Sequence, residues 1–227
     1  MSSFSAVVFD LDDTLYSERE YVYSGFAAVA EAFADQLGNS RDSISRMCRL
    51  FDTQHRARVF NALLAELGMY EDKALIEKLI NVYRTHRPTI QLFDDVETAL
   101  TVLRADYRLG LLTDGRSTTQ SLKIDALGLR RRIDATVISG ELGPGFDKPH
   151  PRSFEIIAKM LQVEANRCVY VADNPAKDFV APNNLGWLTV QIRRAGGLYA
   201  DQKPAVGGKA RLFVDTLAHL HDLLHAL

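Results

Sequence analysis

The chain has 227 residues, a formal net charge of −2 and 47% hydrophobic residues, an ordinary globular composition. This near-neutral charge gives no basis for binding nucleic acid or an anionic membrane, and we expect neither partner. Cys48 and Cys168 are too few for a disulfide framework or a zinc site. Without an apolar stretch long enough to suggest a membrane span or a basic leader, the simplest expectation is a cytoplasmic protein whose oligomeric state the sequence leaves open.

The first predicted element is a short buried strand that ends in carboxylates. Apolar residues 7–9 lead directly into Asp10, Asp12 and Asp13. Ligands of parallel sheets bind beyond the carboxyl ends of the strands, so function should begin at Asp10. The strand period would place Asp10 and Asp12 on one side, where like charges need a cation or a proton between them. Mg²⁺ fits because it prefers oxygen ligands, although Asp-x-Asp alone also occurs in turns and helix caps.

Residues 17–88 carry helical patterns and no convincing strand, which predicts an inserted block of four helices. The expected helices cover 17–37, 40–51, 55–67 and 71–86. Four consecutive helices can bury their apolar stripes against each other as a small bundle. Five arginines of the insert could bind a second anionic group, although a solvated helical face is the simpler interpretation: Arg41, Arg46, Arg49, Arg56 and Arg58.

From residue 94 onwards, helices and strands alternate, which indicates right-handed βαβ units and a parallel sheet. The expected strands are 107–112, 135–139, 168–172, 187–192 and 211–214, and the expected helices are 94–105, 116–127, 151–162, 175–185 and 215–226. Asn174 is a plausible N-cap, and Pro182 should make the helix around it short or kinked. Residues 193–209 read as a long loop at the same sheet edge as the acids.

Three further clusters follow predicted strands. Thr113 and Asp114 stand between a strand and a helix, where a hydroxyl and backbone N–H groups can bind an oxyanion. Lys148 lies in a proline-containing loop and could neutralise a phosphate or a nucleophilic carboxylate. Asp173 and Asp178 supply more acids after the strand expected at 168–172.

Four motifs follow one another along the chain: Asp-x-Asp-x-Thr, a strand-end Thr, Lys-Pro, and an Asp with a second Asp five residues on. In this order they resemble the haloacid dehalogenase-like (HAD) hydrolase superfamily, of the phosphatase type. The resemblance implies an α/β fold, with a Rossmann-like parallel sheet core in residues 1–16 and 89–227. Residues 17–88 resemble that family's all-helical C1-type cap. Two departures concern the loop at Asp173, which is flanked by Ala172 and Asn174 where the family more often has Gly and Ser, and which continues with Pro175.

The resemblance also implies roles for the acids. Asp10 would attack phosphorus and form an aspartyl-phosphate, and Asp12 would protonate the leaving alcohol and then activate water. Mg²⁺ would be held by Asp10, the backbone carbonyl of Asp12 and Asp173. The presence of Asp12 speaks against true dehalogenation, because enzymes of that subgroup usually lack the second acid.

The remaining residues of the four clusters would support this chemistry. Thr113, the Asp114 N–H and Lys148 would hold the transferring group. Asp178 would orient Lys148 or a metal-bound water, which leaves open how it shares its role with Asp173. Asn174, in the loop at Asp173, and Thr14 are expected to be supporting residues. Thr14 should fix its loop rather than react.

The function that the sequence predicts is a Mg²⁺-dependent phosphatase of a small phosphorylated metabolite such as a sugar phosphate or a nucleotide. The alternatives are a phosphomutase or phosphotransferase and a non-catalytic binding or regulatory protein with the same fold. Specificity should reside in the helical insert.

Histidines raise one further alternative. His219, His221 and His225 could indicate a metal site, but leucines at helical spacing favour an amphipathic closing helix with polar histidines. His150 lies beside Lys148, where a loop or helix-capping role is favoured over contact with a substrate.

Overall fold

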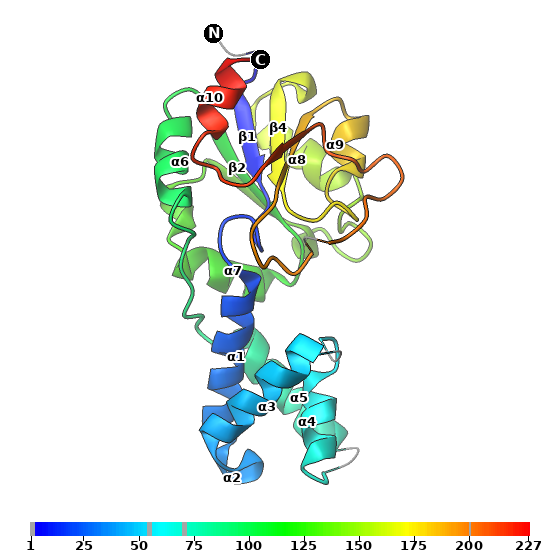
Figure 1. Cartoon of the computed structure of the whole chain (residues 1–227). Coiled ribbons are helices and arrows are strands. Elements are labelled where there is room, and N and C mark those ends of the chain that lie inside the picture. Colours follow the sequence, from blue (N-terminus) through cyan, green and yellow to red (C-terminus); the bar gives the residue numbers. More distant parts are fainter. Residues whose placement is uncertain (1–2, 54–55, 70–71, 200) are drawn as a thin grey trace. The chain divides into compact units, whose positions relative to one another are not determined.

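The computed structural model describes residues 3–53, 56–69, 72–199 and 201–227. It separates into two compact units. Met1–Glu18 together with Gln91–Leu227 make up the first, here called the core unit, and Arg19–Ile90 make up the second, here called the helical unit (Figure 1). Among the described helices, none combines the length and apolarity needed to cross a membrane.

The core unit is built on a parallel sheet whose strand order is β3-β2-β1-β4-β5-β6. The strands are β1 (Ala6–Phe9), β2 (Arg108–Thr113), β3 (Ala135–Ile138), β4 (Cys168–Ala172), β5 (Leu188–Ile192) and β6 (Leu212–Val214). This confirms the predicted α/β, Rossmann-like fold. The strand order reverses beside β1, so the crevice beyond β1 and β4 is the switch point at which such sheets bind ligands.

Helices cover both faces of this sheet (Figure 1). They are α6 (Val96–Leu103), α7 (Ser117–Ala126), α8 (Arg152–Leu161), α9 (Val180–Asn184) and α10 (Leu220–His225), with 3₁₀ turns at Leu129–Arg131, Ser139–Glu141 and Ala165–Arg167. Helix α8 packs on β2 and β3, and α10 contacts α6. The apolar strand residues predicted to be buried lie inside these layers, because β1 and β4 are buried at every position.

Aromatic rings fill the core beside α8. The ring of Phe154 meets Tyr170 and Trp187 edge to face, with centroids 4.9 and 5.7 Å apart. Gly110 of β2 leaves the space that α8 needs, since a Cβ there would lie 2.9 Å from Val8 Cγ2 and 3.0 Å from Ile157 Cδ1. This close packing fixes β1, β2 and β4 as a rigid support for the residues at their carboxyl ends.

The helix expected at 175–185 is shorter than predicted and begins at Val180. The Asn174 side chain accepts from the Ala176 N–H, and Asp178 accepts from the Asn174 N–H, so this stretch forms a tight turn instead. Asn174 is therefore a turn residue and not the N-cap. Pro182 is the third residue of α9, where its missing N–H needs no partner within the helix.

The closing helix also starts later than the predicted residue 215, since α10 begins at Leu220. Three of the four leucines expected on its apolar face are buried, namely Leu217, Leu220 and Leu224, whereas Leu227 is exposed. The amphipathic pattern is therefore confirmed within α10, but it fails beyond the end of the helix, and the N-terminal boundary was wrong.

The helical unit contains five helices among the described residues, where four were predicted. They are α1 (Glu18–Ala32), which begins at the last residue of the core unit, α2 (Ala34–Leu37), α3 (Ser40–Thr53), α4 (Val59–Glu66) and α5 (Lys73–Thr85). The first predicted helix is interrupted at Phe33, which gives α1 and α2. The expected starts at 55 and 71 lie outside the described residues.

An aromatic cluster holds this unit together. The ring of Phe26 lies 6.2, 6.1 and 5.9 Å from those of Phe51, Phe60 and Tyr83, measured between centroids. Of the five arginines considered as an anion site, Arg49 forms an ion pair with Glu66, in which its Nη2 atom donates to both carboxylate oxygens at 2.7 Å. This agrees with a solvated helical face for Arg49.

Candidate active site

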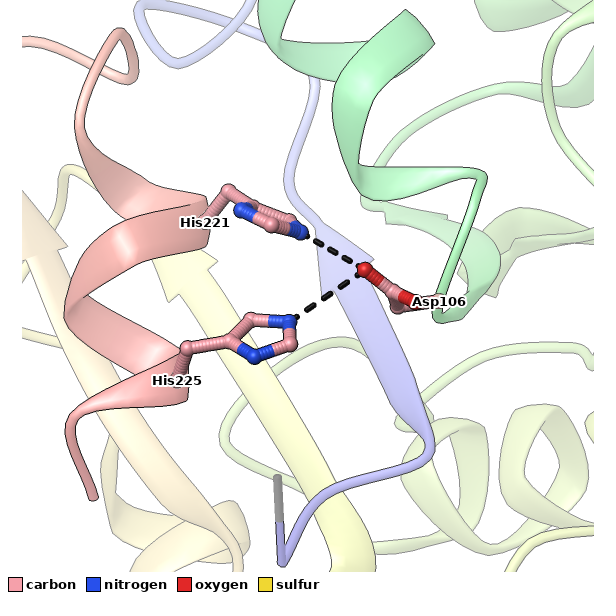
Figure 2. A group of neighbouring side chains, drawn as sticks. All are labelled: Asp106, His221 and His225. Atoms are coloured by element: carbon pink, nitrogen blue, oxygen red, sulfur yellow. Dashed lines mark hydrogen bonds and ion pairs between the residues drawn. The ribbon is translucent and has the colours of Figure 1, made fainter. Parts of the chain in front are cut away.

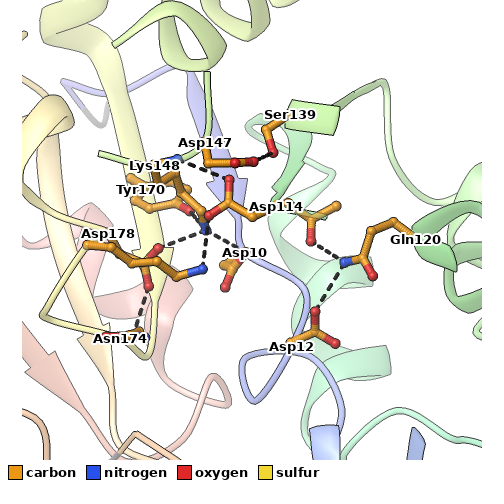
Figure 3. Close-up of polar contacts among 12 residues, drawn as sticks. Asp10, Asp12, Asp114, Gln120, Ser139, Asp147, Lys148, Tyr170, Asn174 and Asp178 are labelled. Atoms are coloured by element: carbon orange, nitrogen blue, oxygen red, sulfur yellow. Dashed lines mark hydrogen bonds and ion pairs between the residues drawn. The ribbon is translucent and has the colours of Figure 1, made fainter. Parts of the chain in front are cut away.

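Asp10 follows the last residue of β1, and its carboxylate meets the ammonium group of Lys148 (Figure 3). Lys148 Nζ lies 2.8 Å from Asp10 Oδ1, 2.7 Å from Asp178 Oδ1 and 3.0 Å from the Tyr170 hydroxyl. The Lys148 side chain has no exposed surface. Two buried carboxylates therefore share one buried cation.

Asp12 has its own ammonium group. Lys123 Nζ of α7 donates to Asp12 Oδ1 at 2.7 Å, Gln120 Nε2 donates to Asp12 Oδ2 at 3.1 Å, and the Tyr16 hydroxyl donates to Oδ1. The strand ends at Phe9, so the expected strand alternation between Asp10 and Asp12 does not apply. The two acids still line the same pocket, and each is neutralised by a different lysine.

Thr113 and Asp114 end β2 at the same sheet edge. The Thr113 hydroxyl accepts a 2.6 Å hydrogen bond from Gln120 Nε2, which also contacts Asp12. Asp114 accepts from the backbone N–H of Lys148 at 3.1 Å, and its second oxygen pairs with Lys177 Nζ at 2.9 Å. The Asp114 side chain therefore contacts both the Lys148 backbone and the Lys177 side chain, and Asp114 is part of the pocket lining.

Asp173 and Asp178 have different surroundings, although both follow β4. Asp178 has no exposed surface; it pairs with Lys148 and accepts from the Asn174 N–H at 2.9 Å. Asp173 Oδ2 is buried and has no hydrogen-bond partner among the described residues. Ligand oxygens of Asp10, Asp173 and Asp178 lie within 4.8 Å of one another. Asp173 Oδ2 is thus available as a ligand atom, whereas Asp178 Oδ1 is paired with Lys148.

Asp13, which had no expected role, organises the loop at 193–209. Its two carboxylate oxygens accept from the N–H groups of Glu18, at 2.8 Å, and Leu198, at 2.6 Å. Arg194 donates to the backbone carbonyl of Thr14, whereas the Thr14 hydroxyl is buried without a partner in the part of the chain that is described. Thr14 thus holds this loop through its backbone, and the loop lies at the acid edge as predicted.

These residues enclose a pocket of about 140 Å³. It is lined by Asp10, Asp12, Glu18, Thr113, Asp114, Asp173, Asn174, Lys177 and Tyr199. The lining therefore brings together residues from three of the four clusters predicted from the sequence. Lys148, from the fourth cluster, is not part of the lining but contacts Asp10 through its ammonium group.

Burial and charge set the protonation of the acids. Burial raises the pKa of Asp10 to about 6, against the charge of Lys148. Burial and the neighbouring Asp10 and Asp178 hold the pKa of Asp173 well above its usual range. Burial opposes ionisation of Asp12 too, but the charge of Lys123 and its hydrogen bonds keep the Asp12 pKa below the ordinary value. Bringing a divalent cation to Asp10 and Asp173 would favour their ionised forms.

Sequence reasoning missed several lining and contacting residues. Gln120 and Lys123 are three positions apart on α7, and this i, i+3 spacing of two polar residues after Thr113 was the available signal. Lys177 stands next to Asp178 but was given no role. No pattern pointed to Glu18 or Tyr199, whose pKa values are raised to about 8, mainly by burial, and about 12, mainly by Glu18.

His150 lies outside the pocket lining. Its Nδ1 accepts a hydrogen bond from the Arg152 N–H at the start of α8, at 3.1 Å, and its ring meets Phe146. The peptide bond from Lys148 to Pro149, just before His150, is cis. The helix-capping interpretation of His150 is the one that these contacts support.

The Rossmann-like sheet carries a cluster of acids and lysines at its carboxyl edge, and comparison with known proteins gives the class of enzyme. The sequence model of the family described as "haloacid dehalogenase-like hydrolase" matches residues 4–186. The chain therefore belongs to the haloacid dehalogenase-like hydrolases.

Individual relatives span nearly the whole chain. A glyceraldehyde 3-phosphate phosphatase of Methanopyrus kandleri is 31% identical over 208 residues, which cover 88% of this chain and 87% of the relative. The N-acylneuraminate-9-phosphatase of Rattus norvegicus is 28% identical over 221 residues, which cover 90% and 88%. The structure of the Bacillus subtilis hydrolase YfnB, bound to magnesium, has the same fold, with a TM-score of 0.70, 22% identity and coverage of 97% of this chain and 98% of that one.

Proposed function

We propose that the protein is a Mg²⁺-dependent phosphatase that hydrolyses phosphate monoesters of small metabolites, with phosphorylated sugars as the preferred class. The single observation that carries the proposal is the pocket in which Asp10, Asp12 and Thr113 meet, with Lys148 bonded to Asp10 at 2.8 Å. The phosphatases of M. kandleri and R. norvegicus support the substrate class, because their names specify glyceraldehyde 3-phosphate and an N-acylneuraminate phosphate. A cytoplasmic location and the absence of nucleic-acid or membrane partners stay part of the proposal.

The atoms of the acid cluster fit Mg²⁺. A buried carboxylate oxygen without a hydrogen-bond partner, Asp173 Oδ2, is costly unless something positive completes it. Asp10 and Asp173, with the backbone carbonyl of Asp12, would hold the ion, since Asp178 is occupied by Lys148 and the Asn174 N–H. Bound there, Mg²⁺ would supply positive charge against the oxygens of the transferring phosphoryl group.

Hydrolysis then takes two chemical steps, in which Asp10 and Asp12 have separate roles. In the first, an oxygen of Asp10 forms a bond to phosphorus, the bond from phosphorus to the ester oxygen breaks, and Asp12 gives a proton to the departing alcohol. In the second, Asp12 takes a proton from water, which attacks phosphorus and releases inorganic phosphate from Asp10. Three donors fix the position of Asp12 and favour its ionised form, which suits the second step. For the first step, Asp12 takes up a proton when the substrate binds and passes that proton to the departing alcohol.

The phosphate-holding groups would be Thr113, the backbone N–H of Asp114 and Lys148, with Lys177 as an additional cation in the pocket lining. Asp178 positions Lys148 through the 2.7 Å ion pair. Asn174 and Thr14 support the loops on either side. In the helical unit, we propose a cap that selects the substrate and excludes water, with residues 17–88 as its extent.

Hydrolysis of an aryl phosphate with Mg²⁺ tests the mechanism. Asp10→Asn should abolish turnover without changing the fold, and Asp215→Asn, at an exposed carboxylate of the same unit, is the matched control. Undiminished hydrolysis by D10N would refute the mechanism. A panel of phosphorylated sugars and nucleotides, scored by kcat/KM, then tests the substrate class. Release of free phosphate in amounts equal to the alcohol separates a phosphatase from a phosphomutase.

A further inference from the structure

Two histidines of α10 face one carboxylate on the surface of the core unit (Figure 2). The Nε2 atoms of His221 and His225 lie 2.7 and 3.2 Å from the same oxygen, Asp106 Oδ2. The ring centroids are 4.3 Å apart, because residues four positions apart lie on one side of a helix. Asp106 lies between α6 and β2, 115 positions from His221, so the fold and not the local sequence assembles this group.

We propose that Asp106, His221 and His225 form a binding site for a divalent transition-metal ion of the Zn²⁺ type, separate from the acid cluster of the active site. Each residue offers one ligand atom, and these atoms lie within 4.8 Å of one another. Two imidazole nitrogens and one carboxylate oxygen are a donor set that suits Zn²⁺, Ni²⁺ and Cu²⁺, whereas Mg²⁺ prefers oxygen ligands alone. Solvent can complete the coordination, since all three side chains are partly exposed.

The surroundings of the rings favour binding through Nε2. Asp222 Oδ1 lies 3.5 Å from the Nδ1 atom of His221, on the side opposite Asp106. A carboxylate at that position would hold a proton on Nδ1 once a metal ion displaces the proton that Nε2 shares with Asp106. The buried ring of Tyr107 meets both histidine rings edge to face, at centroid distances of 6.2 and 6.0 Å, and supports them from below.

A proton and a metal ion compete for the same nitrogen. Hydrogen bonding to Asp106 raises the pKa of His221, so protonated His221 persists to higher pH than an ordinary histidine does. The binding measurement therefore belongs near pH 8, where the metal displaces little proton. When bound, the ion would link α10 to the segment between α6 and β2.

Calorimetric titration with Zn²⁺ near pH 8, in a large excess of Mg²⁺ that occupies the active-site carboxylates, tests the proposal. We expect one Zn²⁺ ion per chain to bind under these conditions. His221→Gln and His225→Gln should each weaken binding by at least about tenfold, and Asp222→Asn should do so to a smaller extent. His219→Gln is the matched control, because His219 is exposed in the same segment but is outside the group of three.

A second measurement, of thermal stability, tests the proposal independently of the number of Zn²⁺ ions bound. Zn²⁺ should raise the melting temperature of the wild type and of H219Q, and it should not raise that of H225Q or of Asp106→Asn. Circular dichroism without metal checks that each variant is folded. No Zn²⁺ bound in excess Mg²⁺, undiminished binding by the H221Q/H225Q double variant, or an equal loss in H219Q would each overturn the proposal.

Discussion

Lys123 Nζ donates a 2.7 Å hydrogen bond to Asp12 Oδ1 across 111 positions of the sequence. Lys123 is buried, and so is Gln120 beside it on α7. Helix α7 thus carries the groups that hold the second acid of the pocket in place. In the resting protein this arrangement favours the ionised form of Asp12, which is the form that can activate water.

Lys123→Met should raise the pKa of Asp12, because the cation that offsets its burial is removed. We expect the limb of the pH–rate profile that reports Asp12 to move to higher pH, and kcat to fall by about tenfold or more. The measurement is hydrolysis of an aryl phosphate between pH 5 and 9 with saturating Mg²⁺.

Lys159→Met is the control for this change, since Lys159 is an exposed lysine on α8. Its profile should match that of the wild type. If K123M had an unshifted profile and an unchanged kcat, Lys123 would have no part in positioning Asp12.

Asp173→Asn should weaken Mg²⁺ binding rather than phosphate binding. Its Oδ2 is buried and has no hydrogen-bond partner among the described residues, whereas Asp178 Oδ1 forms an ion pair with Lys148. We expect the Mg²⁺ concentration for half-maximal activity to rise at least about tenfold, with recovery of much of kcat at high Mg²⁺. The measurement is a Mg²⁺ titration of turnover; an unaltered half-saturation point would remove Asp173 from the metal site.

Asp178→Asn should instead lower stability, because Asp178 forms a fully buried ion pair with Lys148. Removing one partner of a buried pair costs about 3–5 kcal/mol, and the remaining contact of Lys148 with Asp10 places this variant near the lower end. Urea denaturation monitored by circular dichroism gives the free energy of unfolding. A loss no larger than that of the exposed-site variant D215N would contradict this role.

The stability of the protein should depend on pH and Mg²⁺ together. Burial raises the folded-state pKa of Asp10 from 3.8 to about 6 and that of Glu18 from 4.5 to about 8. A raised pKa gives stability that is present below the unfolded value and is lost as pH rises through the folded value. Without divalent cations, stability should therefore fall between about pH 4 and pH 8.

Mg²⁺ should reverse this loss by favouring the ionised carboxylates. At a concentration of about 100 times its Kd, the gain is about 2.7 kcal/mol. Thermal melts at pH 5 and pH 8, with Mg²⁺ or with a chelator, measure the effect. We expect the larger rise in melting temperature at pH 8, and a larger rise at pH 5 would disprove the linkage.

The sheet could be predicted from the sequence because its strands are short apolar runs, each followed by a polar cluster. Thr113 and Asp173 could be placed at one edge for the same reason, since the carboxyl ends of parallel strands meet there. Contacts made by side chains from the outer layers could not be inferred in this way. Lys123 reaches Asp12 from a helix, and only the packing of α7 shows that it does.

A predicted helix boundary was wrong where side-chain oxygens compete with the helix for backbone N–H groups. The turn at Asn174 and Asp178 uses side-chain oxygens to satisfy backbone N–H groups, which delays α9 to Val180. No pattern pointed to Asp13, because its two partners share none. The Glu18 N–H is 5 positions away along the chain, and the Leu198 N–H is 185 positions away. His221 and His225 could be placed on a helix, but their partner Asp106 could not be found by spacing.

The chain leaves the core unit and returns to it at adjoining points. Tyr16 forms an antiparallel bridge with Leu92, and the Phe93 N–H donates to the Leu15 carbonyl at 3.0 Å. Joining these two points by a short linker would leave every strand connection of the sheet intact. The helical segment could therefore be exchanged for that of a relative as a cassette, and the substrate preference of the hybrid would show whether this segment selects the substrate.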